Sequence, residues 1–311
     1  MTYVVTYRTP LTEYLFTDSK SIIPIFLQMD VKKSIISRGL NKLHYKVWHR
    51  FYSCDFSSDI RLRLSNLRCD DKLIFLLDIP YDIMRINMFC KHVANKVVYL
   101  WNPKSYYDRY VPISKSLMKN KDRYLCLINY CNSLGIRVST FDESDANQYK
   151  IGYYPQFYRK KGDICPKTIL NTFFFLGRDK GRRKVLDSMI NTFSKYGKCN
   201  FIITETNTQK DTVNYNDYIK ELITSSVLFD VVQSGQTGMT LRILEGLFYR
   251  KKIVTNNALI RNYPFYNSTN FLIYKEDISD EEITGFLNSS YIDYPTSIIE
   301  NYSMDKWAHN V

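Results

Sequence analysis

The sequence predicts an α/β protein of two domains, each built on a parallel sheet that helices cover on both faces. Three observations indicate this class. The chain has 311 residues, which suits two domains of about 150 residues better than a single hydrophobic core. Apolar residues make up 45% of the chain, enough to fill such cores. Short apolar runs also alternate with amphipathic stretches, as expected of strand–helix–strand units.

The second half shows this alternation most clearly. Short apolar runs predict buried strands, and between them apolar residues recur at the three- and four-residue spacing of a helix. The predicted strands are 172–176, 201–204, 227–232, 252–255 and 271–274. The predicted helices are 182–196, 215–225 and 240–249. We therefore expect a parallel sheet between residues 172 and 274.

The first half follows the same scheme with weaker signals. Apolar runs predict strands at 73–79, 97–101 and 136–141, and helical spacing predicts helices at 84–95 and 125–134. Gly135 is the expected stop signal of the second of these helices. The stretch up to residue 70 is ambiguous, and a helix over 41–52 is the one element that we predict there.

Glycine, proline and basic residues cluster between 149 and 166 and indicate an interdomain linker. We expect a first domain over 1–155, a second over 156–295, and a C-terminal helix over 296–311 that returns to the first domain.

The net charge of +12 is uneven. Residues 1–150 hold 23 Lys and Arg against 14 Asp and Glu, a net of +9, whereas the rest hold 20 against 17, a net of +3. A basic first half indicates a polyanionic partner such as nucleic acid, an anionic membrane surface or a phosphorylated substrate. A nucleic-acid-binding α/β protein is therefore one candidate for the function. However, the sequence has no recognisable nucleic-acid-binding motif and its aromatics cluster in core-like runs, so we expect no nucleic acid partner.

The cysteines and the N-terminus indicate a cytoplasmic protein. Seven scattered cysteines without a CxxC pair argue against a disulfide framework and against a zinc site. The N-terminus lacks the basic and apolar regions of a signal peptide. The longest apolar runs are far shorter than the roughly 18 residues of a membrane span.

The loop after the strand at 172–176 predicts an anion site. Gly177 lets the backbone approach a ligand, and the following helix start offers free N–H groups and a positive dipole end. Arg178 and Lys180, followed by Arg182 and Arg183, add formal charge suited to a pyrophosphate. The alternative is that these cations only solvate a helix start, where they oppose the dipole at a cost of a few tenths of a kcal/mol each.

The loop after the strand at 227–232 predicts a second contact with the same ligand. Ligands of open α/β sheets bind beyond the carboxyl ends of the strands. The residues Ser234, Gly235, Thr237 and Gly238 are the expected phosphate contacts of this loop.

Arg242 and Glu245 lie three residues apart on the predicted helix at 240–249 and so share one face. One interpretation is a surface ion pair worth less than about 1 kcal/mol. The other is that Glu245 accepts hydrogen bonds from a ribose diol with Arg242 nearby.

These two loops carry a family resemblance. Residues 172–275 resemble the donor-binding domain of GT-B glycosyltransferases, whose fold has two Rossmann-like domains facing each other across a cleft. The segment FLGR with the lysine after it resembles their diphosphate loop, and GQTGMTLRILEG followed by KKIVTNN resembles their donor motif. The resemblance implies that 1–155 binds the acceptor and 156–295 the nucleotide sugar.

By the same resemblance Arg178 binds the diphosphate and Glu245 the ribose. The more usual retaining families carry a further glutamate about eight residues before the second, and Thr237 holds that place here. In length and in its tyrosine-rich, basic character the chain also resembles enterobacterial lipopolysaccharide core biosynthesis proteins, the core rhamnosyltransferase among them. That likeness implies a hexosyl- or deoxyhexosyltransferase, peripheral on the inner face of the cytoplasmic membrane, with lipopolysaccharide core or another phosphorylated glycolipid as acceptor.

An inverting transferase needs a general base, which should come from the first half. Asp78 and Asp82 flank the end of a predicted strand and are the candidates, with His44 and His49 as alternatives. The chain contains no Asp-x-Asp triplet, so we expect no metal or other cofactor besides the nucleotide sugar. A dinucleotide-dependent oxidoreductase is disfavoured because no GxGxxG follows a predicted strand, and a non-catalytic scaffold stays open.

Overall fold

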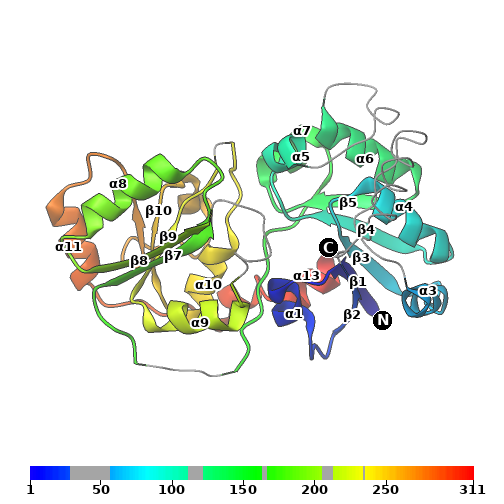
Figure 1. The fold of residues 1–311 in the computed structure, drawn as a ribbon, viewed down its shortest axis with the longest axis horizontal. Coiled ribbons are helices and arrows are strands. Elements are labelled where there is room, and N and C mark those ends of the chain that lie inside the picture. Colours follow the sequence, from blue (N-terminus) through cyan, green and yellow to red (C-terminus); the bar gives the residue numbers. More distant parts are fainter. Residues whose placement is uncertain (29–56, 111–121, 163–166, 205–212, 234) are drawn as a thin grey trace, which may run out of the picture. The chain divides into compact units, whose positions relative to one another are not determined.

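The computed structural model describes residues 1–28, 57–110, 122–162, 167–204, 213–233 and 235–311. They form two α/β units, each with one sheet, which confirms the predicted fold class (Figure 1). All strand pairs within these two sheets are parallel in the described residues.

The first unit comprises residues 1–155 and 307–311, and the second comprises residues 156–306. The division after Pro155 lies within the segment rich in glycine, proline and basic residues. Of the C-terminal segment 296–311, only the last five residues group with the first unit.

The sheet of the first unit has the strand order β2-β1-β3-β4-β5-β6. Its strands are β1 (Thr2–Tyr7), β2 (Ile22–Leu27), β3 (Lys72–Leu76), β4 (Asn95–Leu100), β5 (Arg137–Thr140) and β6 (Gly152–Tyr153). Its helices are α1 (Pro10–Phe16), α3 (Ser58–Ser65), α4 (Pro80–Phe89), α5 (Lys104–Tyr110), α6 (Arg123–Ser133) and α7 (Glu143–Tyr149). Strand order reverses between β1 and β3, as in doubly wound sheets.

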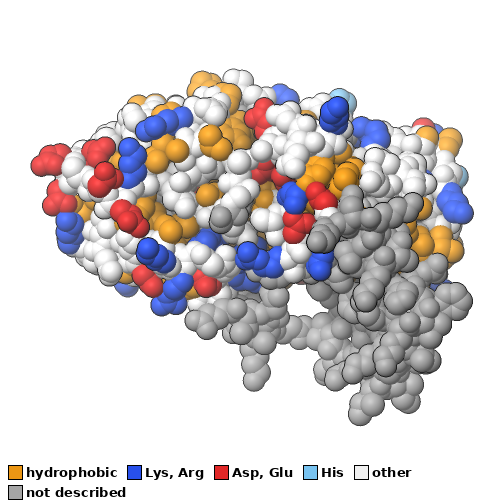
Figure 2. Space-filling model, turned by 90° about the horizontal axis from the view of Figure 1, so that it is seen from above, with side chains coloured by type: hydrophobic (Ala, Val, Ile, Leu, Met, Phe, Trp, Pro, Cys, Tyr) orange, Lys and Arg blue, Asp and Glu red, His pale blue; other side chains and the backbone are white. Residues whose placement is uncertain are grey.

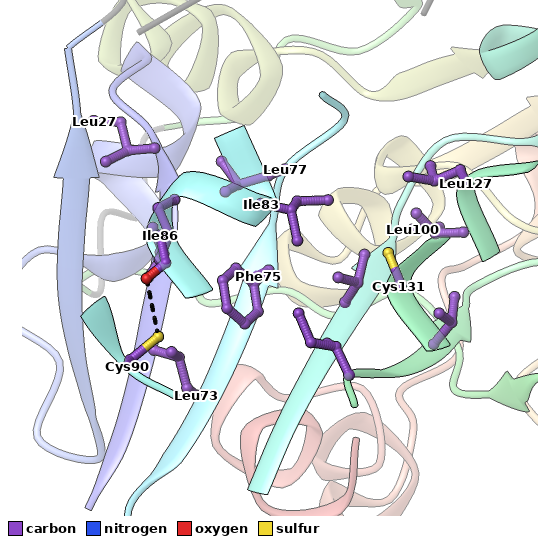
Figure 3. Close-up of a cluster of buried hydrophobic side chains, with 14 of the residues drawn as sticks. Leu27, Leu73, Phe75, Leu77, Ile83, Ile86, Cys90, Leu100, Leu127 and Cys131 are labelled. Atoms are coloured by element: carbon purple, nitrogen blue, oxygen red, sulfur yellow. Dashed lines mark hydrogen bonds between the residues drawn. The ribbon is translucent and has the colours of Figure 1, made fainter. Parts of the chain in front are cut away.

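One face of this sheet packs against α3, α4 and α6. Alternate residues of β3, namely Leu73, Phe75 and Leu77 just beyond it, point toward Ile83 and Ile86 of α4 (Figure 3). The period of two in the strand and of three to four in the helix places all of these side chains in one interior. The result is a continuous apolar core that fixes the position of the segment between β3 and α4.

The C-terminal residues pack against the opposite face of the same sheet. The indole of Trp307 is fully buried. Its ring lies 5.3 Å from that of Tyr99 on β4 and 6.3 Å from that of Phe16 at the end of α1. Helix α13 (Met304–Asn310), which carries Trp307, therefore covers this face together with α1 (Figure 1).

The sheet of the second unit has the strand order β11-β10-β9-β7-β8. Its strands are β7 (Thr172–Arg178), β8 (Lys198–Thr204), β9 (Val227–Asp230), β10 (Lys252–Thr255) and β11 (Phe271–Ile273). Its helices are α8 (Arg183–Phe193), α9 (Tyr215–Thr224), α10 (Leu241–Tyr249), α11 (Asp280–Asn288), α12 (Thr296–Glu300) and the short 3₁₀ helix η2 (Ala258–Asn262). Helices α8 and α11 cover one face of the sheet and α9 and α10 the other (Figure 1).

Two buried lysines at the start of β10 join the sheet to helices on both faces. Lys251 Nζ donates to the carbonyl of Ile223 in the last turn of α9, at 2.5 Å. Lys252 Nζ donates to the carbonyls of Phe286 and Ser289 at the end of α11. Successive strand residues point to opposite faces, and ammonium groups stabilise the negative ends of helices. The Lys-Lys pair is thus accounted for by helix capping.

Several boundaries differ from the sequence predictions. The strand predicted at 73–79 ends at Leu76, and the helix predicted at 84–95 runs from Pro80 to Phe89. Pro80 takes the first helical position, where its fixed φ favours the helix and its missing N–H costs nothing. Gly135 has φ +70° just after α6, as its predicted stop role requires. The helix predicted at 41–52 lies outside the described residues.

The C-terminal anchor of the first unit can be tested by truncating its indole. We expect Trp307→Ala to lower the free energy of unfolding by about 3–5 kcal/mol, because it removes a fully buried ring and leaves a cavity. Urea unfolding followed by circular dichroism measures this. Trp307→Phe should retain more than half of the lost stability, and a loss below about 1 kcal/mol for the alanine variant would contradict the assigned packing.

Candidate functional site

The second unit has its topological switch point between β7 and β9. From β7 the chain passes through α8 to β8 on one side, and from β9 it passes through α10 to β10 on the other. The loops that leave these two neighbouring strands therefore diverge at their carboxyl ends. Such a divergence forms the crevice in which doubly wound sheets bind ligands. Both loops singled out in the sequence lie at this edge.

The loop after β7 carries one exposed arginine, Arg178, and one buried arginine, Arg182. Gly177 and Arg178 end the strand, and the Arg178 side chain is exposed. Lys180 adopts a left-handed φ of 48° and Gly181 one of 79°, which turns the chain into α8. The carboxylate of Asp179 accepts a hydrogen bond from the backbone N–H of Arg182 at 2.9 Å. The loop thus has a defined conformation with one arginine outside and another inside.

Arg182 joins the ends of the two strands from inside. Its guanidinium donates to the carbonyl of Val231, just after β9, at 2.6 Å and to the carbonyl of Arg178 in β7. The residue is only 7% exposed. Burial, and next the neighbouring charge of Arg242, lower the pKa of Arg182 to about 10. It therefore remains charged at neutral pH.

Arg242 makes the matching connection from α10. Its Nη2 donates to the carbonyl of Leu176 in β7 at 2.8 Å, and its Nη1 lies 3.8 Å from Oδ1 of Asp230. The side chain is 16% exposed. Both Arg182 and Arg242 lie over the ring of Phe175, at 5.4 and 4.5 Å from its centroid. Among the described residues the buried Nε of Arg242 has no hydrogen-bond partner, so its N–H is an unused donor.

Asp230, the last residue of β9, is fully buried at the centre of these contacts. It accepts hydrogen bonds from Thr240, the N-cap of α10, at 2.5 Å and from Thr255 at the end of β10 at 3.0 Å. The carboxylate of Asp230 therefore lies beside both guanidiniums, which brings two positive charges close together at this edge. A lone Asp at the end of a strand gave no signal that distinguishes it from a turn residue, and the sequence reading missed it.

The loop after β9 is held by two asparagines that follow β10. Asn256 Oδ1 accepts from the backbone N–H of Val232 at 2.8 Å, and Asn257 Nδ2 donates to the carbonyl of Thr237 at 3.3 Å. Gly235 has a left-handed φ of 80°. Thr237 is half-buried and Gly238 is buried. Ser234, the remaining predicted contact of this loop, lies outside the described residues.

Glu245 points into the protein. It is 2% exposed, and its two carboxylate oxygens accept hydrogen bonds from the hydroxyls of Tyr215 and Tyr218 on α9. Burial raises the pKa of Glu245, and burial together with the charge of Glu245 raises those of both tyrosines well above 10. A ribose diol reaches this carboxylate only if the tyrosines move. In this conformation Glu245 joins α9 to α10, which differs from the ribose contact expected from the sequence.

The two predicted catalytic aspartates lie at the carboxyl end of β3 in the first unit, beside the reversal between β1 and β3. Asp78 Oδ1 accepts a hydrogen bond from the hydroxyl of Tyr107 at 2.9 Å. Asp82 Oδ2 accepts one from the hydroxyl of Tyr7, the last residue of β1, at 2.8 Å. Asp78 is half-buried, whereas Asp82 is 0% exposed in the first turn of α4. The alternative bases His44 and His49 lie outside the described residues.

Two further features concern the whole described chain. No group of three or more His, Cys, Asp or Glu side chains in these ranges could hold a metal ion. None of their helices is long and apolar enough to cross a membrane.

Comparisons with known proteins give only distant likenesses. No family model and no curated protein sequence matches the chain. The glycotransferase of kitacinnamycin is similar in structure with a TM-score of 0.40 and 11% identity, over 99% of this chain and 94% of that one. The GtfA/B complex is similar with a TM-score of 0.41 and 12% identity, over 84% of this chain and 60% of that one. Likenesses of this size identify no activity.

The close packing of the two arginines can be tested at Gly177. A Cβ at this position would overlap Nη2 of Arg242, which is fixed by its bond to Leu176. We expect Gly177→Ala to lower the free energy of unfolding by about 1–3 kcal/mol through overpacking. Gly285 on α11 is the matched control, because a Cβ there meets nothing within 4 Å and alanine favours the helix by about 1 kcal/mol. Equal stability changes in the two variants, measured by thermal unfolding, would contradict the packing described.

Proposed function

We propose that the chain is a glycosyltransferase that uses a nucleotide sugar, and that its second unit binds the diphosphate of the donor at the switch point between β7 and β9. The supporting observation is the pair of neighbouring guanidiniums there: Arg182 is buried, Arg242 is 16% exposed, and the charge of Arg242 contributes to lowering the pKa of Arg182. An anion at this edge would reduce the repulsion between the two guanidiniums, and the N-termini of α8 and α10 at the same edge favour it further.

In the proposed complex, the more exposed cations contact the ligand, whereas the arginines bonded to backbone carbonyls act from beneath it. Arg178 is exposed and Lys180 half-buried on the loop after β7, so these side chains can contact phosphate oxygens. Arg182 and Arg242 are committed to backbone carbonyls and act through their charge and by fixing the loops. Gly177, Gly235, Thr237 and Gly238 provide backbone against the ligand, with Ser234 as a further predicted contact. Glu245 supports the site by holding α9 against α10.

The proposed reaction is a displacement at the anomeric carbon of the donor. The acceptor hydroxyl forms the new bond to this carbon as the bond to the diphosphate oxygen breaks, and the diphosphate leaves with the bonding electrons. Fixed cations offset the charge that develops on the leaving group. A carboxylate at the carboxyl end of β3, Asp78 or Asp82, takes the proton of the acceptor hydroxyl. Direct displacement by one hydroxyl inverts the configuration at this carbon.

The donor part of this proposal is tested by ligand-induced stabilisation. We expect at least one of UDP, dTDP, GDP and ADP, or a sugar derivative of it, to raise the melting temperature, because a ligand that binds only the folded state stabilises it. Arg178→Ala should weaken that binding by about 1–2 kcal/mol, the value of a charge-assisted hydrogen bond. Calorimetry measures the affinity.

Arg250→Ala is the matched control for this experiment. Arg250 is also an exposed arginine of the second unit, but it pairs with Asp293 at 2.8 Å. Its removal should leave nucleotide affinity unchanged. Absence of binding by all four nucleotide classes would remove the donor site, and equal losses in the two variants would remove Arg178 from it.

We further propose a membrane-anchored, phosphorylated acceptor such as lipopolysaccharide core, with rhamnose as one candidate donor sugar and the inner membrane surface as the place of action. The support is the net charge of +9 in residues 1–150 and the sequence resemblance described above. On the face shown in Figure 2, lysine and arginine side chains lie among acidic and neutral ones. Attraction to lipid would therefore come from many separate charges.

Vesicle binding tests the membrane part separately. We expect the protein to sediment with vesicles containing one third phosphatidylglycerol at 20 mM salt and to be released at 500 mM, because salt screens the attraction between exposed charges. Vesicles of phosphatidylcholine alone are the control. Equal sedimentation with both vesicle types, or with neither, would contradict an electrostatic membrane attachment. Release from the anionic vesicles by single-stranded DNA at low salt, without nucleotide binding in calorimetry, would favour a nucleic-acid-binding protein.

A further inference from the structure

The segment from Asp78 to Asp82 carries two carboxylates whose surroundings differ sharply. Asp82 lies within α4, is 0% exposed, and is bonded to Tyr7 at the end of β1. This bond connects the start of α4 to the neighbouring strand across the point where strand order reverses. Asp78 precedes α4 and is half-buried. Its hydrogen-bond partner is Tyr107 on α5, the helix that follows β4.

The partner of Asp78 is a rigid one. Tyr107 is 0% exposed, and its ring packs edge-on against that of Tyr106 at 5.5 Å and in a tilted arrangement against that of Tyr124 at 5.3 Å. Burial, followed by the charge of Asp78 and the neighbouring tyrosine Tyr124, raises the pKa of Tyr107 well above 10. Its hydroxyl therefore stays protonated throughout the physiological range and donates to the carboxylate of Asp78.

A general base must reach the proton that it removes, and it works best when its orientation is fixed beforehand. Asp82 does not meet the first condition, because its carboxylate is enclosed. Asp78 meets both, since it is partly accessible and its Oδ1 is bonded to a buried hydroxyl. The same hydrogen bond stabilises the ionised carboxylate, which is the form that accepts a proton.

We infer that Asp78 is the catalytic base of the proposed transfer and that Tyr107 is its positioning residue, whereas Asp82 and Tyr7 form a structural link between α4 and β1. This inference rests on the proposed function for the chemical step only. The pairing of Tyr107 with Asp78 is a property of the unliganded protein. In the transfer, the proton of the acceptor hydroxyl moves to the Asp78 carboxylate as the new glycosidic bond forms.

The pairing is tested by carboxyl titration in the full chain, followed by carbon-detected NMR. Removing the donor in Tyr107→Phe should raise the titration midpoint of Asp78 by roughly half a unit to one unit, the equivalent of one lost hydrogen bond. Tyr99→Phe is the matched control, because it also removes a buried tyrosine hydroxyl of the first unit, one bonded at 3.1 Å to the carbonyls of Tyr154 and Pro155. It should leave the Asp78 midpoint unchanged. An unchanged midpoint in Tyr107→Phe, or equal shifts in both variants, would overturn the positioning role.

The catalytic role is tested by nucleoside diphosphate release from UDP-, dTDP-, GDP- and ADP-sugars, with circular dichroism to count folded molecules. Asp78→Asn should lower kcat by roughly 100-fold or more, the usual contribution of a general base. Tyr107→Phe should shift the acid limb of the pH profile upward by the same amount as the titration midpoint, with KM for the donor unchanged. Loss of turnover in Asp82→Asn with full turnover in Asp78→Asn would reverse the assignment. If the parent protein turns over none of these sugars, the proposed function fails while the titration still decides the pairing.

Discussion

The second unit depends on a group of three neighbouring charged side chains, Arg182, Arg242 and Asp230, where its strand order reverses. At this point the chain leaves two adjacent parallel strands in opposite directions, so the carbonyls at the strand ends lack the partners that a continuing sheet would give them. The two guanidiniums supply those partners, at Leu176 and Arg178 on one strand and at Val231 beyond the other. Buried carbonyls without such donors would each cost about 1–3 kcal/mol.

The same arrangement has an electrostatic consequence. Burial of the Arg182 guanidinium, and next its proximity to the charge of Arg242, lowers the pKa of Arg182. The fold sustains this because each guanidinium is hydrogen-bonded and lies over the ring of Phe175. The same arginines that bond the strand-end carbonyls thus also place two positive charges at this edge of the sheet. Structure and proposed function have a common physical origin here.

The two units share one strand order but carry different side chains where that order reverses. Both sheets reverse their strand order beside the first strand of the unit, at β1 and β3 in one and at β7 and β9 in the other. In the second unit arginines join the strand ends across the reversal, whereas in the first unit a tyrosine and an aspartate do so. In the proposed function, the arginine edge receives the anionic leaving group and the aspartate edge takes the proton.

Local sequence pattern was sufficient for the fold class and for most of the second unit. Apolar runs and helical spacing located β7, β9 and β10, because their side chains pack on both faces and leave an unmistakable hydrophobic signal. The pattern was less informative in the first unit. Strand β1 (TYVVTY) mixes polar and apolar residues, although Val4 and Val5 are fully buried. Its central position comes from pairing with β2 and β3, which no local pattern encodes.

The sequence by itself located the loops that follow β7 and β9 and the segment that follows β3, since apolar runs and the turn residues after them mark these places locally. Only the tertiary structure decided which way their side chains point. Glu245 was expected to face a ligand but accepts hydrogen bonds from two tyrosines about 30 residues earlier in the chain. Asp78 and Asp82 have the same chemistry and the same local pattern, yet one is accessible and the other enclosed. Burial and hydrogen-bond partners depend on helices that are distant in sequence, so a single segment cannot reveal them.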